Sequence, residues 1–187
     1  MEKLILNLTD ETIEKYIKNT KKLIKLCDKN NLELELKYDS ITNKELLNNM
    51  INIKTAINIK DKYKRYEFIY DIICNDLDKK LNTNYCEFKN DICKYFREKN
   101  ELNHKNGCCY SDSRGGLCKY LDKDHCTIKS ISCKLYSCPT LRENNINFKI
   151  REIPLLKYFF NIKQKYYLKY SFFKDKTYVM YKLMEKK

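Results

Sequence analysis

Apolar residues recur at three- and four-residue steps along much of the chain, the spacing that gathers them on one face of an α-helix. Such a stripe predicts a first helix over 10–28, with Thr9 as its cap. A capping-box pair, Thr42 and Glu45, predicts a second helix that starts near residue 43. The clearest stripe predicts a third helix over 61–81, and its members are Tyr63, Tyr66, Ile69, Tyr70, Ile73, Leu77 and Leu81.

Two further helices are predicted near the C-terminus. Pro154 suits the first turn of a helix, here over 155–171, and a short helix over 175–184 follows. The stripe of the longer helix comprises Leu155, Phe159, Ile162, Tyr166 and Tyr170. Strict alternation of apolar and polar residues predicts one short strand over 32–38, and no β-α-β alternation is evident. The predicted fold class is therefore mainly α, with little β.

Residues 83–143 break this pattern. The segment holds eight of the ten cysteines and all three glycines, and it predicts a loop-rich cysteine knuckle with the helices packed around it. Because such a segment buries too little apolar surface to fold alone, a metal staple is expected. The chain is accordingly divided into an N-terminal helical region (1–82), a cysteine-rich metal-binding segment (83–143) and basic aromatic C-terminal helices (144–187), which together form one compact domain.

The eight cysteines of the middle segment are candidate metal ligands, because thiolates bind zinc ions and iron–sulfur clusters. They are Cys86, Cys93, Cys108, Cys109, Cys118, Cys126, Cys133 and Cys138. Zinc knuckles usually bring cysteines about two to four residues apart, and no C-x-x-C pair occurs here, so the spacing favours an iron–sulfur cluster over zinc. Cys27 and Cys74 fall within helical stripes and are interpreted as small buried hydrophobes. His104 and His125 are interpreted as surface or outer hydrogen-bonding groups, although either imidazole could replace a thiolate.

Three features of residues 107–141 form a recognisable pattern. These are a Gly-Cys-Cys entry at 107–109, a run with Cys118, Tyr120 and Leu121 before Cys126-Thr-Ile128, and an exit formed by Cys133, Lys134 and Tyr136. In these features the segment resembles the YkgJ-like family of zinc- or iron-chelating cysteine-cluster proteins, some of which are described as flagellin lysine N-methylases. Residues 86–93, with a cysteine at each end, match its upstream part more loosely. The resemblance implies a metal or cluster site.

The formal net charge of +13 changes this picture little. Lysine outnumbers arginine 33 to 5, and arginine is the preferred residue for bidentate phosphate and guanine contacts, so nucleic acid is not the favoured partner. Residues 144–187 nevertheless carry a net charge of +8 and eleven Phe or Tyr residues. Two interpretations are open. The residues form a basic aromatic surface that binds nucleic acid or a membrane, or they form a pair of helices whose aromatic residues are core. The helical spacing favours the core interpretation.

Several functional classes lack their sequence features. No apolar run reaches the roughly 20 residues that span a bilayer, and the N-terminus is too polar for a secretory signal. A cytoplasmic location is therefore expected, where cysteines serve metal or redox chemistry more often than a disulfide framework, the alternative for an exported chain. Glycine-rich nucleotide-binding turns and C-x-x-C redox pairs are absent from the sequence, so no enzyme class is assigned.

The leading functional hypothesis is a metal-binding protein with one or two iron–sulfur clusters or zinc ions. Its role would be structural, redox- or iron-sensing, or electron transfer. One alternative is a cluster-dependent modifying enzyme such as a lysine N-methylase, which rests on the family resemblance alone. Another is a zinc-stapled protein that binds nucleic acid through 144–187. The sequence identifies no partner, and a protein partner is compatible with the leading hypothesis.

Overall fold

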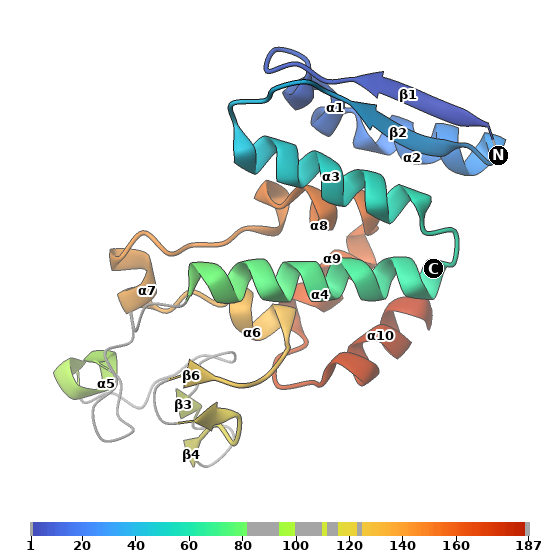
Figure 1. Cartoon of the computed structure of the whole chain (residues 1–187). Coiled ribbons are helices and arrows are strands. Elements are labelled where there is room, and N and C mark those ends of the chain that lie inside the picture. Colours follow the sequence, from blue (N-terminus) through green and yellow to red (C-terminus); the bar gives the residue numbers. More distant parts are fainter. Residues whose placement is uncertain (1, 82–93, 100–109, 112–115, 123–124, 186–187) are drawn as a thin grey trace. The chain divides into compact units, whose positions relative to one another are not determined.

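The computed structural model describes residues 2–81, 94–99, 110–111, 116–122 and 125–185. In these residues the protein is mainly helical with short strands, which confirms the predicted fold class (Figure 1). The chain forms two compact units. Unit 1 comprises Met1–Ile69 and Arg151–Asn161, and unit 2 comprises Tyr70–Ile150 and Ile162–Lys187.

Unit 1 begins with a parallel pair of strands that the sequence analysis missed in part. Strands β1 (Lys3–Asn7) and β2 (Glu33–Lys37) lie side by side, with Leu4 opposite Leu34 (Figure 1). Helices α1 (Ile13–Lys18) and α2 (Thr20–Asn30) make the crossover that a parallel pair requires. The expectation that the chain lacks a β-α-β unit is therefore wrong. β1 was missed because its apolar residues are consecutive and show no period of two.

The helix predicted over 10–28 is two helices, and it starts later than predicted. Thr9 forms a turn with Thr12, to whose Oγ1 it donates its backbone N–H (2.9 Å), and α1 begins only at Ile13. Asn19 separates α1 from α2 with φ −93° and ψ 10°. Its side-chain amide donates to the Lys15 carbonyl at 2.8 Å, and its backbone N–H donates to the same carbonyl at 3.1 Å. A local side-chain bond thus supplements the helical one at this break.

Helix α3 (Lys44–Asn58) starts where the sequence predicts, but a different residue caps it. The Asn43 side chain accepts the Leu46 backbone N–H at 3.0 Å. Thr42, the predicted cap, instead donates its hydroxyl to the Asp10 carboxylate at 2.9 Å, and this bond lowers the pKa of Asp10. The buried face of α3 is formed by Leu47, Met50, Ile53, Ala56 and Ile57, and α8 (Pro154–Phe159) packs against the helix.

The end of α3 is tied to the edge of the sheet. The Asn58 side-chain amide donates to the Leu34 carbonyl at 2.9 Å, and its oxygen accepts the Leu34 N–H at 2.8 Å. One side chain thus satisfies the outward backbone groups of a fully buried strand residue.

Helix α4 (Lys62–Lys80) matches its prediction closely. Five members of its stripe are buried, namely Tyr66, Ile69, Tyr70, Ile73 and Leu77. Its residues up to Ile69 belong to unit 1 and those from Tyr70 onward belong to unit 2.

Unit 2 contains more regular structure than a loop-rich knuckle. Within the described part of 83–143, the helices are α5 (Lys94–Lys99), α6 (Ile131–Leu135) and α7 (Pro139–Glu143). Two minimal hairpins pair β3 (Tyr110–Ser111) with β4 (Gly116–Leu117) and β5 (Leu121–Asp122) with β6 (His125–Cys126). α6 packs on α9 (Ile162–Tyr170), so the exit of the cysteine segment is part of a helical core.

The C-terminal prediction needs two corrections. The helix expected over 155–171 is α8 and α9, separated at Phe160, whose backbone is extended. Residues of the predicted stripe in α9 face solvent: Ile162 is 86% exposed, Tyr166 68% and Tyr170 48%. Gln164 and Leu168 are buried in their place. The interpretation of these aromatic residues as core is therefore wrong, because periodicity identifies a face without showing which face packs.

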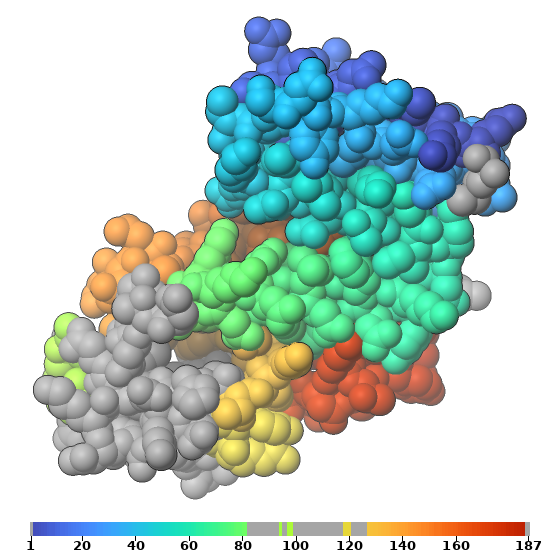
Figure 2. All heavy atoms as spheres, viewed as in Figure 1, coloured from blue at the N-terminus to red at the C-terminus, as the bar shows by residue number. Residues whose placement is uncertain are grey.

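The last predicted helix is confirmed as α10 (Lys176–Glu185). It buries Val179, Met180 and Leu183, and it reaches the molecular surface, where it is red in Figure 2. Within the part of the chain that the structure describes, none of the helices combines the length and apolar character that crossing a membrane requires.

Candidate metal centre

The structure places four of the eight predicted ligands within described residues. Cys118 follows β4 and is buried, Cys126 lies in β6 opposite Leu121, Cys133 lies in α6, and Cys138 precedes α7 as its N-terminal cap residue. The other four, Cys86, Cys93, Cys108 and Cys109, lie outside the described residues, as do His104 and the side chains of Cys126 and His125.

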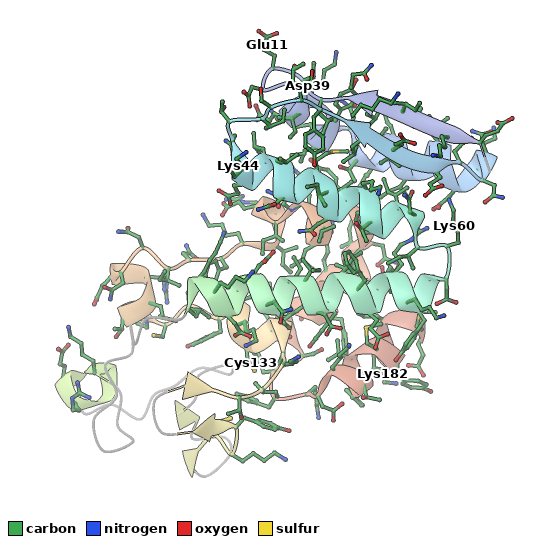
Figure 3. The ribbon with its side chains drawn as sticks, viewed as in Figure 1. Glu11, Asp39, Lys44, Lys60, Cys133 and Lys182 are labelled. Carbon is green, nitrogen blue, oxygen red and sulfur yellow. The ribbon has the colours of Figure 1, made fainter. Side chains whose placement is uncertain are left out.

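Helix α6 is the best-defined carrier of a predicted ligand. The Ser132 hydroxyl donates to the Leu168 carbonyl of α9 at 2.6 Å. The Tyr70 hydroxyl of α4 donates to the Lys129 carbonyl at 3.1 Å and accepts the Ile131 N–H at 3.3 Å. The apolar side chains of Ile131 and Leu135 in α6 are also buried, which anchors this short helix in the core. Cys133 is therefore fixed by contacts with two longer helices, and Figure 3 labels it on α6.

The Cys133 sulfur receives a backbone hydrogen bond from a distant part of the chain. The Phe173 N–H donates to Cys133 Sγ at 3.3 Å. Phe173 has φ 61°, in the left-handed region that is unfavourable for a bulky side chain. Backbone held in such a conformation points to a constraint imposed by the surroundings. Here that conformation directs an N–H group at a sulfur atom.

Two acidic groups of α4 in this part of the core, Tyr70 and Cys74, have raised pKa values. Burial raises the pKa of Tyr70 well above its ordinary value, and the nearby Cys74 and Cys133 raise it further. Burial also raises the pKa of Cys74 to about 12, although the Lys134 ammonium opposes this effect. Lys134 is itself buried and pairs with Asp78. Cys74 is thus a protonated, buried thiol, as predicted, and Cys27 is likewise buried.

The described thiols do not form a complete ligand set by themselves. Among the described residues, no three His, Cys, Asp or Glu side chains are placed to hold one metal ion. Cys118 and Cys138 lie outside disulfides, so both thiols keep the chemistry of a ligand. The remaining predicted thiolates lie outside the described ranges, and the eight-cysteine set stays a prediction.

The groups around Cys133 leave no local signal in the sequence. Phe173 lies forty residues along the chain from Cys133, and no local pattern links them. Lys134 adjoins Cys133 in sequence, but a lysine is expected in solvent unless it is paired. Only the packing of α4 and α6 reveals its pairing with Asp78.

Unit 1 contains an open pocket of about 520 Å³ whose polar side chains are largely engaged. Arg65 makes a two-pronged contact with the Asp28 carboxylate at 2.9 and 3.1 Å and donates to the Ile59 carbonyl at 2.8 Å. Lys60 donates to the Leu32 carbonyl at 2.7 Å. These bonds hold the fold, so the pocket is not assigned a ligand.

Searches of protein-family models, curated proteins and solved structures found no match. The resemblance of residues 107–141 to the YkgJ-like family therefore stays a prediction.

Proposed function

We propose that the protein binds metal through its cysteine segment, holding one or two iron–sulfur clusters or, less favoured, zinc ions. The observation that carries this proposal is the hydrogen bond from the Phe173 N–H to Cys133 Sγ. Hydrogen bonds to ligating sulfur atoms are one means by which proteins orient such ligands and tune cluster potentials. This sulfur lies in a sequence segment with seven other cysteines.

The donor set is suited to this chemistry. Thiolates are soft ligands that bind zinc and iron–sulfur clusters in preference to magnesium or calcium. When bound, a cluster would supply one-electron chemistry, and either metal would staple the segment. The chain's own contribution is to hold Cys133 on a fixed helix and to direct a backbone N–H at its sulfur.

The proposed role is structural, redox- or iron-sensing, or electron transfer in the cytoplasm.

Metal analysis of protein purified without oxygen tests the proposal. We expect a coloured protein with stoichiometric iron and acid-labile sulfide. A colourless protein with stoichiometric zinc would select the zinc form. Protein without bound metal, or with the eight cysteines joined in disulfides, would refute metal binding.

A further inference from the structure

Helix α9 of unit 2 presents a row of exposed residues on the side away from its core. Ile162, Tyr166 and Tyr170 are four residues apart and therefore lie above one another on the helix. The buried residues, Gln164 and Leu168, occupy the opposite side. The Tyr166 and Tyr170 rings lie 4.6 Å apart between centroids, so they form one continuous aromatic patch.

The neighbouring helix α10 carries exposed tyrosines as well. Tyr178 and Tyr181 are exposed there, and α10 packs against α9. We name the set Ile162, Tyr166, Tyr170, Tyr178 and Tyr181 the α9–α10 aromatic surface.

Lysine ammonium groups lie beside three of these rings. Lys169 lies 5.1 Å from the centre of the Tyr170 ring, Lys174 lies 5.2 Å from that of Tyr178, and Lys182 lies 5.1 Å from that of Tyr181. Lys182 is labelled on α10 in Figure 3. Each of these three rings thus has a positively charged group beside it.

The acidic groups of this region do not cancel its charge. Residues 162–187 contain eight lysines against two acidic residues. The Asp175 carboxylate accepts the Tyr178 N–H at 2.8 Å in the first turn of α10, and Glu185 pairs with Lys182 at 2.6 Å. The partner of this surface should therefore be an anion that also offers flat apolar faces.

We propose that the α9–α10 aromatic surface binds single-stranded nucleic acid, a function that goes beyond metal binding and does not depend on it. Unpaired bases stack on tyrosine rings, while lysines neutralise the phosphates between them. A membrane-bound helix would instead present one continuous apolar face, aromatic residues included, with its lysines on the opposite side. Here the lysines border phenol rings, which favours a nucleic acid.

We expect binding to depend little on the base sequence of the nucleic acid. Lysine makes point-charge contacts with phosphate and lacks the two-pronged geometry with which arginine reads guanine. Stacking is available to every base, because each base has a π face. Duplex nucleic acid, whose bases are already stacked, should bind more weakly than a single strand.

Fluorescence anisotropy of the full-length, metal-loaded protein with a labelled oligouridylate of about 12 nucleotides tests the proposal. Tyr166→Ala and Tyr170→Ala should each weaken binding on the order of tenfold through the loss of stacking. Tyr166→Phe should retain binding, because the ring face remains. Lys163→Gln and Lys169→Gln should each lower the slope of log affinity against log salt by about 0.7.

Matched controls come from unit 1. Tyr38 and Tyr63 are also exposed tyrosines, and Tyr38→Ala and Tyr63→Ala should leave binding unchanged. The proposal is overturned if the oligonucleotide does not bind, or if the unit 1 variants weaken binding as much as the α9 variants. It is equally overturned if anionic vesicles bind in place of the oligonucleotide, or if the surface instead joins two copies of the chain in sedimentation.

Discussion

Cys74 is a residue whose proton links folding to pH. Its thiol is fully buried, and burial raises its pKa from 9.0 to about 12. The unfolded chain therefore loses this proton at a lower pH than the folded chain. The stability that the neutral thiol contributes is complete below pH 9 and is lost as the pH rises from 9 towards 12.

The loss should approach about 1.4 kcal/mol per pH unit within this window. Cys74→Ala removes the titrating group. The free energy of unfolding of this variant should therefore fall less steeply between pH 9 and 11 than that of the wild type. Tyr70, whose pKa is also raised, keeps a residual slope in both proteins. Urea unfolding at a series of pH values measures the difference, and parallel slopes would remove Cys74 as its source.

Loss of a ligand thiolate should reduce both metal content and stability. Cys118→Ser and Cys126→Ser should each lower the metal bound per chain and destabilise the fold, because metal binding energy in such a segment is folding energy. Cys27→Ser is the matched control, since this thiol is buried in unit 1 outside the cysteine segment. It should leave the metal content unchanged. Equal metal in all three variants would contradict the ligand assignment.

At the level of elements, the buried Gln164 marks the face of α9 that packs against the core. The Gln164 side-chain amide donates to the Leu183 carbonyl at 2.8 Å, and that carbonyl belongs to the last turn of α10, where no helical partner remains. Gln164→Ala should therefore lower the free energy of unfolding by about 1–3 kcal/mol, because a buried acceptor loses its donor.

The exposed side of the same helix supplies the control. Tyr166→Ala should change stability by less than about 0.5 kcal/mol, because this side chain faces solvent. Denaturant unfolding followed by circular dichroism measures both variants. A larger cost for Tyr166→Ala than for Gln164→Ala would restore the aromatic stripe as core.

The elements that could be predicted are those with strong local patterns. α4 follows from a long apolar stripe, and the start of α3 follows from polar residues suited to a cap. β1 and the break at Phe160 could not be predicted, because short segments carry too few residues to establish a period.

For the candidate site, the sequence predicts only the type of ligand residue and not the contacts around it. Clustered cysteines identify the type of ligand, whereas the contact between Cys133 and Phe173 depends on how distant helices pack. The exposure of Tyr166 has the same origin, since a stripe of aromatic residues is compatible with either side of α9.

At the scale of the whole molecule, the predicted ligands are confined to one unit. All eight lie between residues 86 and 138, within unit 2. Unit 1 includes Arg151–Asn161, which follows the cysteine segment in the chain. The core of unit 1 contains Leu34, Ile53 and Leu156. The hydrophobic interior of unit 1 should therefore be independent of the proposed metal, whereas part of unit 2 should depend on it.

Removal of the metal should consequently loosen the two units unequally. Amides in α6 and in the second half of α4 should exchange faster with deuterium after chelation, because the staple that holds the cysteine segment is lost. Amides of α3, around Met50 and Ile53, should keep their protection, since apolar packing in unit 1 holds them. Hydrogen exchange with mass spectrometry, with and without metal, resolves these peptides. Equal loss of protection in α3 and α6 would mean that the units unfold together, and unchanged protection in α6 would mean that the metal does not hold unit 2.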